Sequence, residues 1–504
     1  MQFEGKVGKI AVIQLGNPSP GCNNVVDGML KYQYQNKGVS LIGFKEGTKG
    51  IIENNVINIT EESYAPYRNL GGTDYLGLSD SRLQSNLWDT LTERVHEHNI
   101  TGMILIGATH TLTDGARLTN HFLDKGIKCD VVVVPATLDG NIRHRFIQTP
   151  LGFDTASKVY SQLIGNMLTD SASAIKYWYF IRLMGKDPSH LALECALKTH
   201  PNMVVISEEC AFRGENLPDI VNRIADVVEE RANQGKNFGT VLIPEGLLAH
   251  LSAYRHLINE LNDLFKHCGS SHERQQLAKN LASDFTYIKD NLSPWSFSLF
   301  ATLPEFMKIQ LINEQEISGS VNLSQLETEK LISYFVQIEL KRRKNAGTYK
   351  GSFAPVTHFF GYQGRCAHPS AFDCNLGSTL GFAGCALLQA GLTGQAVSVK
   401  ELTNVPSKWR VGGVPILALL RSQPKSGYQR NELVVPSQEI SMTDMPYQVF
   451  KANERDWKFV DHYCNPGPVQ YADFGTNDIS NTMEELYLVE TDIADQIKGL
   501  CNSI

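Results

Sequence analysis

The sequence predicts an α/β fold built on mostly parallel sheets. Three short apolar segments lead to this prediction, namely Lys9–Ile13, Gly102–Gly107 and Val131–Val134. Uninterrupted apolar runs of this length are typical of parallel strands that are buried on both faces. A chain of 504 residues is also too long for a single hydrophobic core. We therefore expect two or more α/β domains.

The composition argues against several classes of protein. The 46 basic and 53 acidic residues give a net charge of -7, which offers no electrostatic basis for binding nucleic acid or a membrane. No apolar run reaches the roughly 20 residues that span a bilayer, and the amino terminus lacks a secretory pattern. The ten cysteines include no Cys-x-x-Cys pair, which argues against a zinc site or a disulfide framework. We expect a soluble, cytoplasmic protein.

The first predicted strand, Lys9–Ile13, is followed by a turn that contains Gly16 and Gly21, and then by a helical pattern. A strand, a glycine-bearing turn and a helix amino terminus can bind an anion, because unpaired backbone amides and the helix dipole point at the ligand. A tight turn without any ligand is the commoner explanation of such a pattern. The pattern alone leaves both possibilities open.

The valine run Val131–Val134 stops at Pro135 and leads into a loop that contains Asp139. In open α/β sheets ligands bind beyond the carboxyl ends of the strands, so Asp139 is predicted to lie where chemistry is usually done. The strand Gly102–Gly107 ends in a similar position and is followed by Thr109 and His110. Asp114 comes a full turn later, inside the helix that is predicted to follow.

Two further stretches are predicted to be helical. Between Leu247 and Lys344 apolar residues recur at helical spacing, as in Leu331–Leu340, and such helices are usually packed elements without a site. From Pro369 to Gly394 small and apolar residues dominate, which indicates a buried, closely packed helix.

Segments of distinctive sequence are spread along the chain. They include Gly152-Phe-Asp-Thr, Phe180-Ile-Arg-Leu-Met-Gly, Ala192-Leu-Glu-Cys-Ala-Leu, Thr199-His-Pro-Asn and His358-Phe-Phe-Gly-Tyr-Gln-Gly-Arg365. In number and order these segments resemble the pyrophosphate-dependent phosphofructokinases of the long eukaryotic type, which occur in plants as catalytic and regulatory subunits. The resemblance covers nearly the whole chain.

The resemblance implies two phosphofructokinase-type domains with mostly parallel sheets, and a helical insertion in the second domain. On this basis the donor-side domain spans residues 1–170 and 376–440. The sugar-phosphate domain then spans residues 171–375 and 441–504, with the insertion at about 247–345. The family also implies a homo-oligomer or a hetero-oligomer with a catalytic subunit.

The resemblance assigns one side of the site to fructose 6-phosphate, with Asp139 as the base towards the sugar hydroxyl. Lys176 and Tyr177 would reach the sugar site of a neighbouring subunit. Lys186 stands where the family usually has arginine, and lysine lacks the fork geometry that suits phosphate. The residues implied to bind the sugar phosphate are Thr137, Leu138, Asp139, Lys176, Tyr177, Met184, Gly185, Lys186, Glu245, Tyr362, Gln363, Gly364 and Arg365.

Two of these residues have a physical role that agrees with the resemblance. A phosphate favours a bidentate guanidinium such as that of Arg365, and sugar hydroxyls favour a carboxylate such as that of Glu245. Without the resemblance, Arg365 would more often be a solvated loop arginine. Glu245 would then be a carboxylate that stabilises a helix amino terminus.

The donor side departs from the family pattern. In the pyrophosphate loop Gly16 keeps the first of two adjacent glycines, but Asn17 replaces the second. Thr109 replaces the aspartate that serves magnesium, and His110 replaces the next aspartate. Mg²⁺ prefers anionic oxygen ligands, and neither a hydroxyl nor an imidazole substitutes for a carboxylate. Mg²⁺, the cofactor of the family, is therefore not expected to bind this chain.

Two more departures lie beside Asp139. Ala136 stands in place of a lysine and Asn141 in place of a second aspartate. The sequence favours a non-catalytic, alpha-like regulatory subunit that binds fructose 6-phosphate and modulates a catalytic partner in glycolysis. The alternative is an active pyrophosphate-dependent phosphofructokinase with a rebuilt donor site, which makes fructose 1,6-bisphosphate. A sugar-phosphate sensor that works without a partner is a third possibility.

Overall fold

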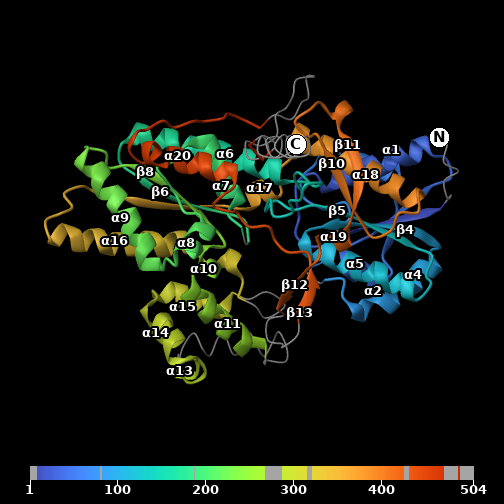
Figure 1. The fold of residues 1–504 in the computed structure, drawn as a ribbon, viewed down its shortest axis with the longest axis horizontal. Helices are drawn as coiled ribbons and strands as arrows, with labels where there is room; N and C mark the ends of the chain where they lie inside the picture. Colours follow the sequence, from blue (N-terminus) through green and yellow to red (C-terminus); the bar gives the residue numbers. More distant parts are fainter. Residues whose placement is uncertain are drawn as a thin grey trace, which may run out of the picture. The chain divides into compact units, whose positions relative to one another are not determined.

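The computed structural model describes residues 8–79, 82–186, 188–266, 286–314, 321–424, 431–469 and 486–487. The chain divides into two compact units, each with a mostly or wholly parallel sheet of its own (Figure 1). Unit 1 comprises Met1–Val159, Tyr362–Gln438 and Pro468–Val489. Unit 2 comprises Tyr160–Gly361, Glu439–Gly467 and Glu490–Ile504. Among the described residues no helix has both the length and the apolar character needed to cross a membrane.

The main sheet of unit 1 has seven strands in the order β11-β10-β5-β4-β1-β2-β3. Its five inner strands run parallel, and the edge strands β3 and β11 run antiparallel to their neighbours. The strands are β1 (Lys9–Gln14), β2 (Ser40–Phe44), β3 (Val56–Asn58), β4 (Ile100–Gly107), β5 (Asp130–Pro135), β10 (Gln395–Lys400) and β11 (Arg410–Pro415), and a separate hairpin pairs β12 (Arg421–Pro424) with β13 (Asn431–Val434). The three strands predicted from apolar runs are β1, β4 and β5, so this prediction is confirmed.

Helices cover both faces of this sheet. The helices of unit 1 are α1 (Cys22–Gln35), α2 (Gly47–Glu53), α3 (Glu61–Tyr64), α4 (Trp88–Glu97), α5 (Thr109–Asp124), α17 (Tyr362–Arg365), α18 (Ala371–Gln389) and α19 (Ile416–Leu419), with 3-10 turns η1 (Ala65–Tyr67), η2 (Ser85–Leu87) and η4 (Pro406–Lys408). Helix α6 (Phe153–Ala174) contains the point at which the chain passes into unit 2.

Alternate residues of each central strand enter opposite cores, as the two-residue repeat of a strand requires. Val132 and Val134 pack with residues of α1 and α18, whereas Val131 and Val133 pack with residues of α4 and α5. Helices α1 and α18 lie side by side (Figure 1). The prediction of a closely packed, buried helix between Pro369 and Gly394 is therefore confirmed.

Unit 2 is built on a four-stranded parallel sheet in the order β7-β8-β6-β9. Its strands are β6 (Trp178–Leu183), β7 (Met203–Val204), β8 (Gly239–Pro244) and β9 (Pro355–Phe360). Besides the later part of α6, its described helices outside the stretch between β8 and β9 are α7 (His190–Thr199), α8 (Ser207–Arg213), α9 (Leu217–Asn233) and α20 (Met445–Phe459). Apolar residues of α9 and α16 pack with those of β6 and β8 in one core.

The described residues between Leu247 and Lys344 are mostly helical, as predicted. Helices α11, α13, α14 and α15 lie together within unit 2 (Figure 1). The elements are α10 (Leu247–His250), α11 (Ser252–Lys266), α13 (Thr286–Asn291), α14 (Pro294–Thr302), α15 (Glu305–Asn313), η3 (Leu323–Gln325) and α16 (Thr328–Asn345). The insertion therefore ends in α16, which returns to the sheet of unit 2.

Candidate functional site

The register of three parallel strands brings the loops that are predicted to form the donor side to one edge of the unit 1 sheet. Gln14 at the end of β1 pairs with Ile106 in β4, and Gly107 pairs with Pro135 in β5. The ladder continues for one more bond, because Ala136 N donates to the carbonyl oxygen of Gly107 at 2.9 Å. The chain therefore leaves all three strands at the same carboxyl edge, where α/β sheets place their ligands.

The loop after β1 is a turn that joins this strand to the start of α1. Gly16 is exposed and has φ of +77°, a conformation that favours glycine. A side chain at Gly16 would meet no atom within 4 Å, so the backbone conformation, and not crowding, requires glycine here. Asn17 is exposed, and Gly21 (φ +82°) immediately precedes α1.

The loop after β4 offers no carboxylate at the predicted metal position. Thr109 begins α5 and is buried, and its carbonyl oxygen accepts a hydrogen bond from Thr113 Oγ1 at 3.0 Å. Asp114 lies one turn further on and is engaged by Arg82, with Nη2–Oδ1 at 2.6 Å and Nε–Oδ2 at 3.2 Å. The sequence did not suggest this pair. The residues present do not fit Mg²⁺, which prefers free anionic oxygens.

The loop after β5 is held by its own polar side chains. Ala136 is buried in the position that the resemblance gives to a lysine. The backbone N–H of Asp139 donates to Thr137 Oγ1 at 3.1 Å, and Asp139 itself is partly exposed. Asn141 is buried, and its amide Nδ2 donates to Ser437 Oγ at 2.9 Å. Asn141 therefore has a structural role, because it ties the Asp139 loop to the segment after β13.

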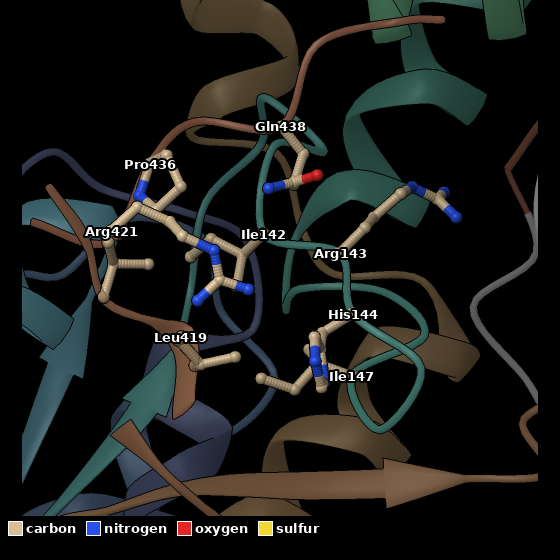
Figure 2. Close-up of a pocket in the computed structure, with 9 residues that line it drawn as sticks. Ile142, Arg143, His144, Ile147, Leu419, Arg421, Pro436 and Gln438 are labelled. Atoms are coloured by element: carbon tan, nitrogen blue, oxygen red, sulfur yellow. The ribbon is translucent and has the colours of Figure 1, made fainter. Parts of the chain in front are cut away.

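A pocket of about 40 Å³ lies directly after this loop (Figure 2). Figure 2 shows the Arg421 side chain extending towards Ile142, whereas the Arg143 side chain points away from the other lining residues. Partial burial, together with the cations Arg145 and Arg421, lowers the pKa of His144. The lining residues are Ile142, Arg143, His144, Ile147, Leu419, Arg421, Val435, Pro436 and Gln438, and none of these nine is acidic.

In unit 2 the parallel register brings several predicted sugar-side residues together. Leu183 at the end of β6 pairs with both Pro244 in β8 and Phe360 in β9. Beyond the strand ends, Met184 N donates to the carbonyl oxygen of Phe360 at 2.9 Å, and Glu245 N donates to that of Leu183 at 3.0 Å. Met184, Gly185 and Glu245 therefore lie at the carboxyl edge of this sheet.

The Glu245 carboxylate is buried, with 2% of the residue exposed. Its Oε2 accepts a hydrogen bond from the backbone N–H of Gly185 at 3.3 Å, and its Oε1 accepts one from Ser324 Oγ at 2.5 Å. Gly185 has φ of +146°, where another residue would be strained. The sequence did not suggest Ser324, because this serine lies 79 residues from Glu245 along the chain.

The other predicted residues of unit 2 lie on its surface. Lys176 is exposed after the end of α6, and its Nζ lies 5.2 Å from the ring centroid of Tyr177. Ile175, just before this pair, has φ of +52°, which is unusual for a β-branched residue. Lys186 is also exposed.

The segment Tyr362–Arg365 forms α17 and belongs to unit 1. Tyr362 and Gln363 are exposed, whereas Gly364 and Arg365 are buried. Arg365 Nη1 donates to the carbonyl oxygen of Pro18, in the loop after β1, at 3.2 Å. The expectation that Arg365, taken without the resemblance, is a solvated loop arginine is therefore wrong: this side chain is buried because it packs against a loop distant in sequence.

The segment Gly152-Phe-Asp-Thr, one of those that carry the resemblance, holds a buried carboxyl pair in unit 1. Asp373 in α18 accepts hydrogen bonds from the backbone N–H groups of Gly152 and Thr155, at 3.0 and 2.9 Å. Asp154 accepts one from Ser370 Oγ at 2.7 Å. Burial and the neighbouring Asp154 raise the pKa of Asp373 to about 7. This segment therefore joins the amino termini of α6 and α18.

The structure is a two-unit α/β fold with loops gathered at the carboxyl edges of its sheets, and sequence comparison identifies the family. The sequence model described as phosphofructokinase matches residues 9–287, which is more than half of the chain. The chain belongs to the phosphofructokinase family, among its pyrophosphate-dependent members.

The similar curated proteins carry the names of both plant subunits and of bacterial enzymes. The chain is 35% identical over 94% of its length to pyrophosphate–fructose 6-phosphate 1-phosphotransferase subunit beta 1 of Arabidopsis thaliana, covering 82% of that protein. It is 37% identical over 93% of its length to subunit alpha 2 of the same plant, covering 75%. It is 36% identical over 92% of its length to the enzyme of Treponema pallidum, covering 80%.

Solved structures confirm the fold. A pyrophosphate-dependent phosphofructokinase from Nitrosospira multiformis superposes with a TM-score of 0.56 at 12% identity, covering 94% of this chain and 96% of the other. Phosphofructokinase from Saccharomyces cerevisiae gives 0.54 at 14% identity, covering 82% of this chain and 45% of the other. The prediction of a two-domain, mostly parallel α/β phosphofructokinase fold is confirmed.

Proposed function

We propose that this chain is a non-catalytic, alpha-like regulatory subunit of pyrophosphate-dependent 6-phosphofructokinase. It binds fructose 6-phosphate and modulates a catalytic partner in glycolysis. One observation carries the proposal: at the carboxyl edge of the unit 1 sheet, Thr109 and Ala136 are buried where the resemblance requires an aspartate and a lysine. The chain is about equally identical in sequence to an alpha subunit and to a beta subunit, so these identities do not decide which kind of subunit it is.

The missing groups matter because phosphoryl transfer depends on positioning and on charge stabilisation by metal and cation. Losing one such contact typically costs about 3 to 4 kcal/mol, and about 1.4 kcal/mol is a factor of ten in rate. Asp114, one turn further along α5, is paired with Arg82 and so provides no replacement. Two or three such losses together slow turnover by several orders of magnitude.

The sugar side supports a binding role. In unit 2 the Glu245 carboxylate lies beside the backbone N–H of Gly185, at the sheet edge where the resemblance implies contact with sugar hydroxyls. In unit 1 the resemblance assigns the Arg365 guanidinium to phosphate. Lys176 and Tyr177 are exposed or partly exposed, as contact with a neighbouring subunit requires.

A turnover assay tests the proposal. The purified chain, given pyrophosphate, Mg²⁺ and fructose 6-phosphate, should show only background turnover. The double variant Thr109→Asp with Ala136→Lys should raise turnover by at least tenfold, because it restores a metal ligand and a cation at adjacent strand ends. The matched control Lys341→Ala, at an exposed lysine of α16, should change nothing. Wild-type turnover of order 10 per second, the ordinary enzyme median, would overturn the proposal.

The alternative function is an active enzyme in which Asp139 is the base and the donor site is rebuilt. The pocket after the Asp139 loop favours this alternative, since Arg421 and His144 line it and none of its nine lining residues is acidic (Figure 2). If this pocket holds the donor, the wild-type chain is active and Arg421→Ala lowers its turnover. Activity that survives Arg421→Ala unchanged excludes the pocket as the donor site.

A further inference from the structure

A buried polar chain links the sheet edge of unit 2 to the end of its helical insertion. Arg182 in β6 is buried, with 3% of the residue exposed, and its Nε lies 2.7 Å from Oε2 of Glu329 in α16. The same guanidinium donates from Nη1 to the carbonyl oxygen of Ser324 at 2.8 Å, and its carbon lies 3.9 Å from the ring centroid of Phe359. Arg182 thus holds both the start of α16 and the backbone of η3.

Ser324, held in this way, faces the carboxylate at the sheet edge. Its Oγ donates to Glu245 Oε1 at 2.5 Å, while the other carboxylate oxygen accepts from Gly185 N at 3.3 Å. The two oxygens of Glu245 are therefore held by two different elements. Burying a carboxylate is costly unless it is hydrogen-bonded, so both contacts restrict its orientation.

We propose that Ser324 is a positioning residue for sugar recognition: its hydroxyl fixes the Glu245 carboxylate in the orientation that accepts sugar hydroxyls. The inference rests on the proposed function, in which Glu245 contacts fructose 6-phosphate. The ligand is recognised through its sugar hydroxyls at this point, and not through its phosphate. The helical insertion thereby contributes to the sugar site through η3.

The mechanism predicts a selective effect. Without the Ser324 hydroxyl, the Glu245 carboxylate keeps the bond to Gly185 as its one hydrogen bond within the described part of the chain, and it can rotate away from the sugar. A hydrogen bond to a charged group contributes about 1.5 to 3 kcal/mol, which corresponds to at least a tenfold change in affinity. Binding of inorganic phosphate, which has no sugar hydroxyls, should be unaffected.

The experiment compares Ser324→Thr with Ser324→Val by titration calorimetry on the full chain. These two side chains have nearly the same shape, so any cost of packing is shared and only the hydroxyl differs. We expect Ser324→Thr to bind fructose 6-phosphate within threefold of wild type and Ser324→Val to bind it at least tenfold more weakly. Ser333→Ala, which removes a buried hydroxyl bound to the α16 backbone, is the matched control and should bind normally.

A double-variant cycle completes the test, because two residues that act through one contact are not additive. Adding Ser324→Val to Glu245→Gln should weaken binding by less than twofold beyond Glu245→Gln alone. If the wild-type chain binds fructose 6-phosphate and Ser324→Val binds it equally well, the inference is overturned while the proposed function stands. A wild-type chain without measurable affinity overturns both. Equal weakening of fructose 6-phosphate and inorganic phosphate overturns the positioning role.

Discussion

Asp373 and Asp154 show how much a single residue depends on its surroundings. Both carboxyl groups are fully buried in unit 1, at the adjoining amino termini of α6 and α18. Two backbone N–H groups favour the ionised form of Asp373, but burial and the neighbouring carboxylate outweigh them and raise its pKa to about 7. The negative charge of Asp154 is balanced by Lys158, whose Nζ lies 2.9 Å from Asp154 Oδ2.

This pair makes stability depend on pH near neutrality. An aspartate of the unfolded chain titrates near about 3.9, so from there up to about pH 7 the native state binds a proton that the unfolded state lacks. The free energy of unfolding should therefore fall as pH rises through this window, by about 1 kcal/mol between pH 6 and 7 from this group. Urea titrations of wild type and Asp373→Asn at a series of pH values measure this free energy.

In these titrations the free energy of unfolding of Asp373→Asn should lack the fall with pH that Asp373 causes in wild type. This holds whatever the absolute stability of the variant. Asp89→Asn, at an exposed position in α4, is the control and should keep the wild-type slope. Identical slopes in wild type and Asp373→Asn would contradict the prediction.

At the scale of elements, the contact between α1 and α18 depends on glycines that let two backbones approach. A Cβ on Gly381 would lie 1.9 Å from the carbonyl oxygen of Val25, and one on Gly28 would lie 1.9 Å from that of Ser378. Backbone atoms cannot yield as a side chain can, so these two glycines set the distance between the helices.

Gly381→Ala should lower the free energy of unfolding by about 2 to 3 kcal/mol, because overpacking forces the helices apart. Gly384→Ala in the same helix is the matched control: its Cβ would meet the Ile104 side-chain methyl at 3.1 Å, which can shift. We expect Gly384→Ala to change stability by less than about 1 kcal/mol. Chemical denaturation measures both variants, and equal losses would contradict this account of the interface.

At the scale of the whole molecule, the question is whether the chain acts through another subunit. The relatives include proteins named as alpha and beta subunits. Lys176 is exposed beside Tyr177 and follows the strained Ile175. Strain of this kind often marks functional segments. We therefore propose that, if the chain modulates a partner, it does so through this surface of unit 2.

Mixed with a catalytic subunit of the family, the chain should change that subunit's affinity for fructose 6-phosphate. Lys176→Ala should remove the change, since the lysine charge would be lost from the partner's sugar site, without preventing the complex. Steady-state kinetics measure the affinity, and analytical ultracentrifugation shows the complex. Lys341→Ala, at an exposed lysine of α16, should behave as wild type. An unchanged affinity in a demonstrated complex would count against the regulatory function.

The sequence by itself determined the local elements and the family of this protein. Runs such as Val131–Val134 predict buried strands, because they are short and β-branched and both alternate faces are apolar. The positions of Gly16, Thr109 and Ala136 after their strands followed from the same runs. The helical stretch before β9 and the buried helix after Pro369 followed from periodicity and small residues. All of these predictions rest on local features of the sequence, namely residue type and the spacing of apolar residues.

Only the tertiary structure decided which distant residues meet. The pairs Arg82 with Asp114, Asn141 with Ser437, and Ser324 with Glu245 join segments that are separated in sequence. No sequence pattern predicts such contacts, because each of them depends on the register of the sheet and on how the loops pack. The burial of Arg365 and the raised pKa of Asp373 arise in the same way. Burial and electrostatics depend on three-dimensional surroundings, which composition and spacing do not contain.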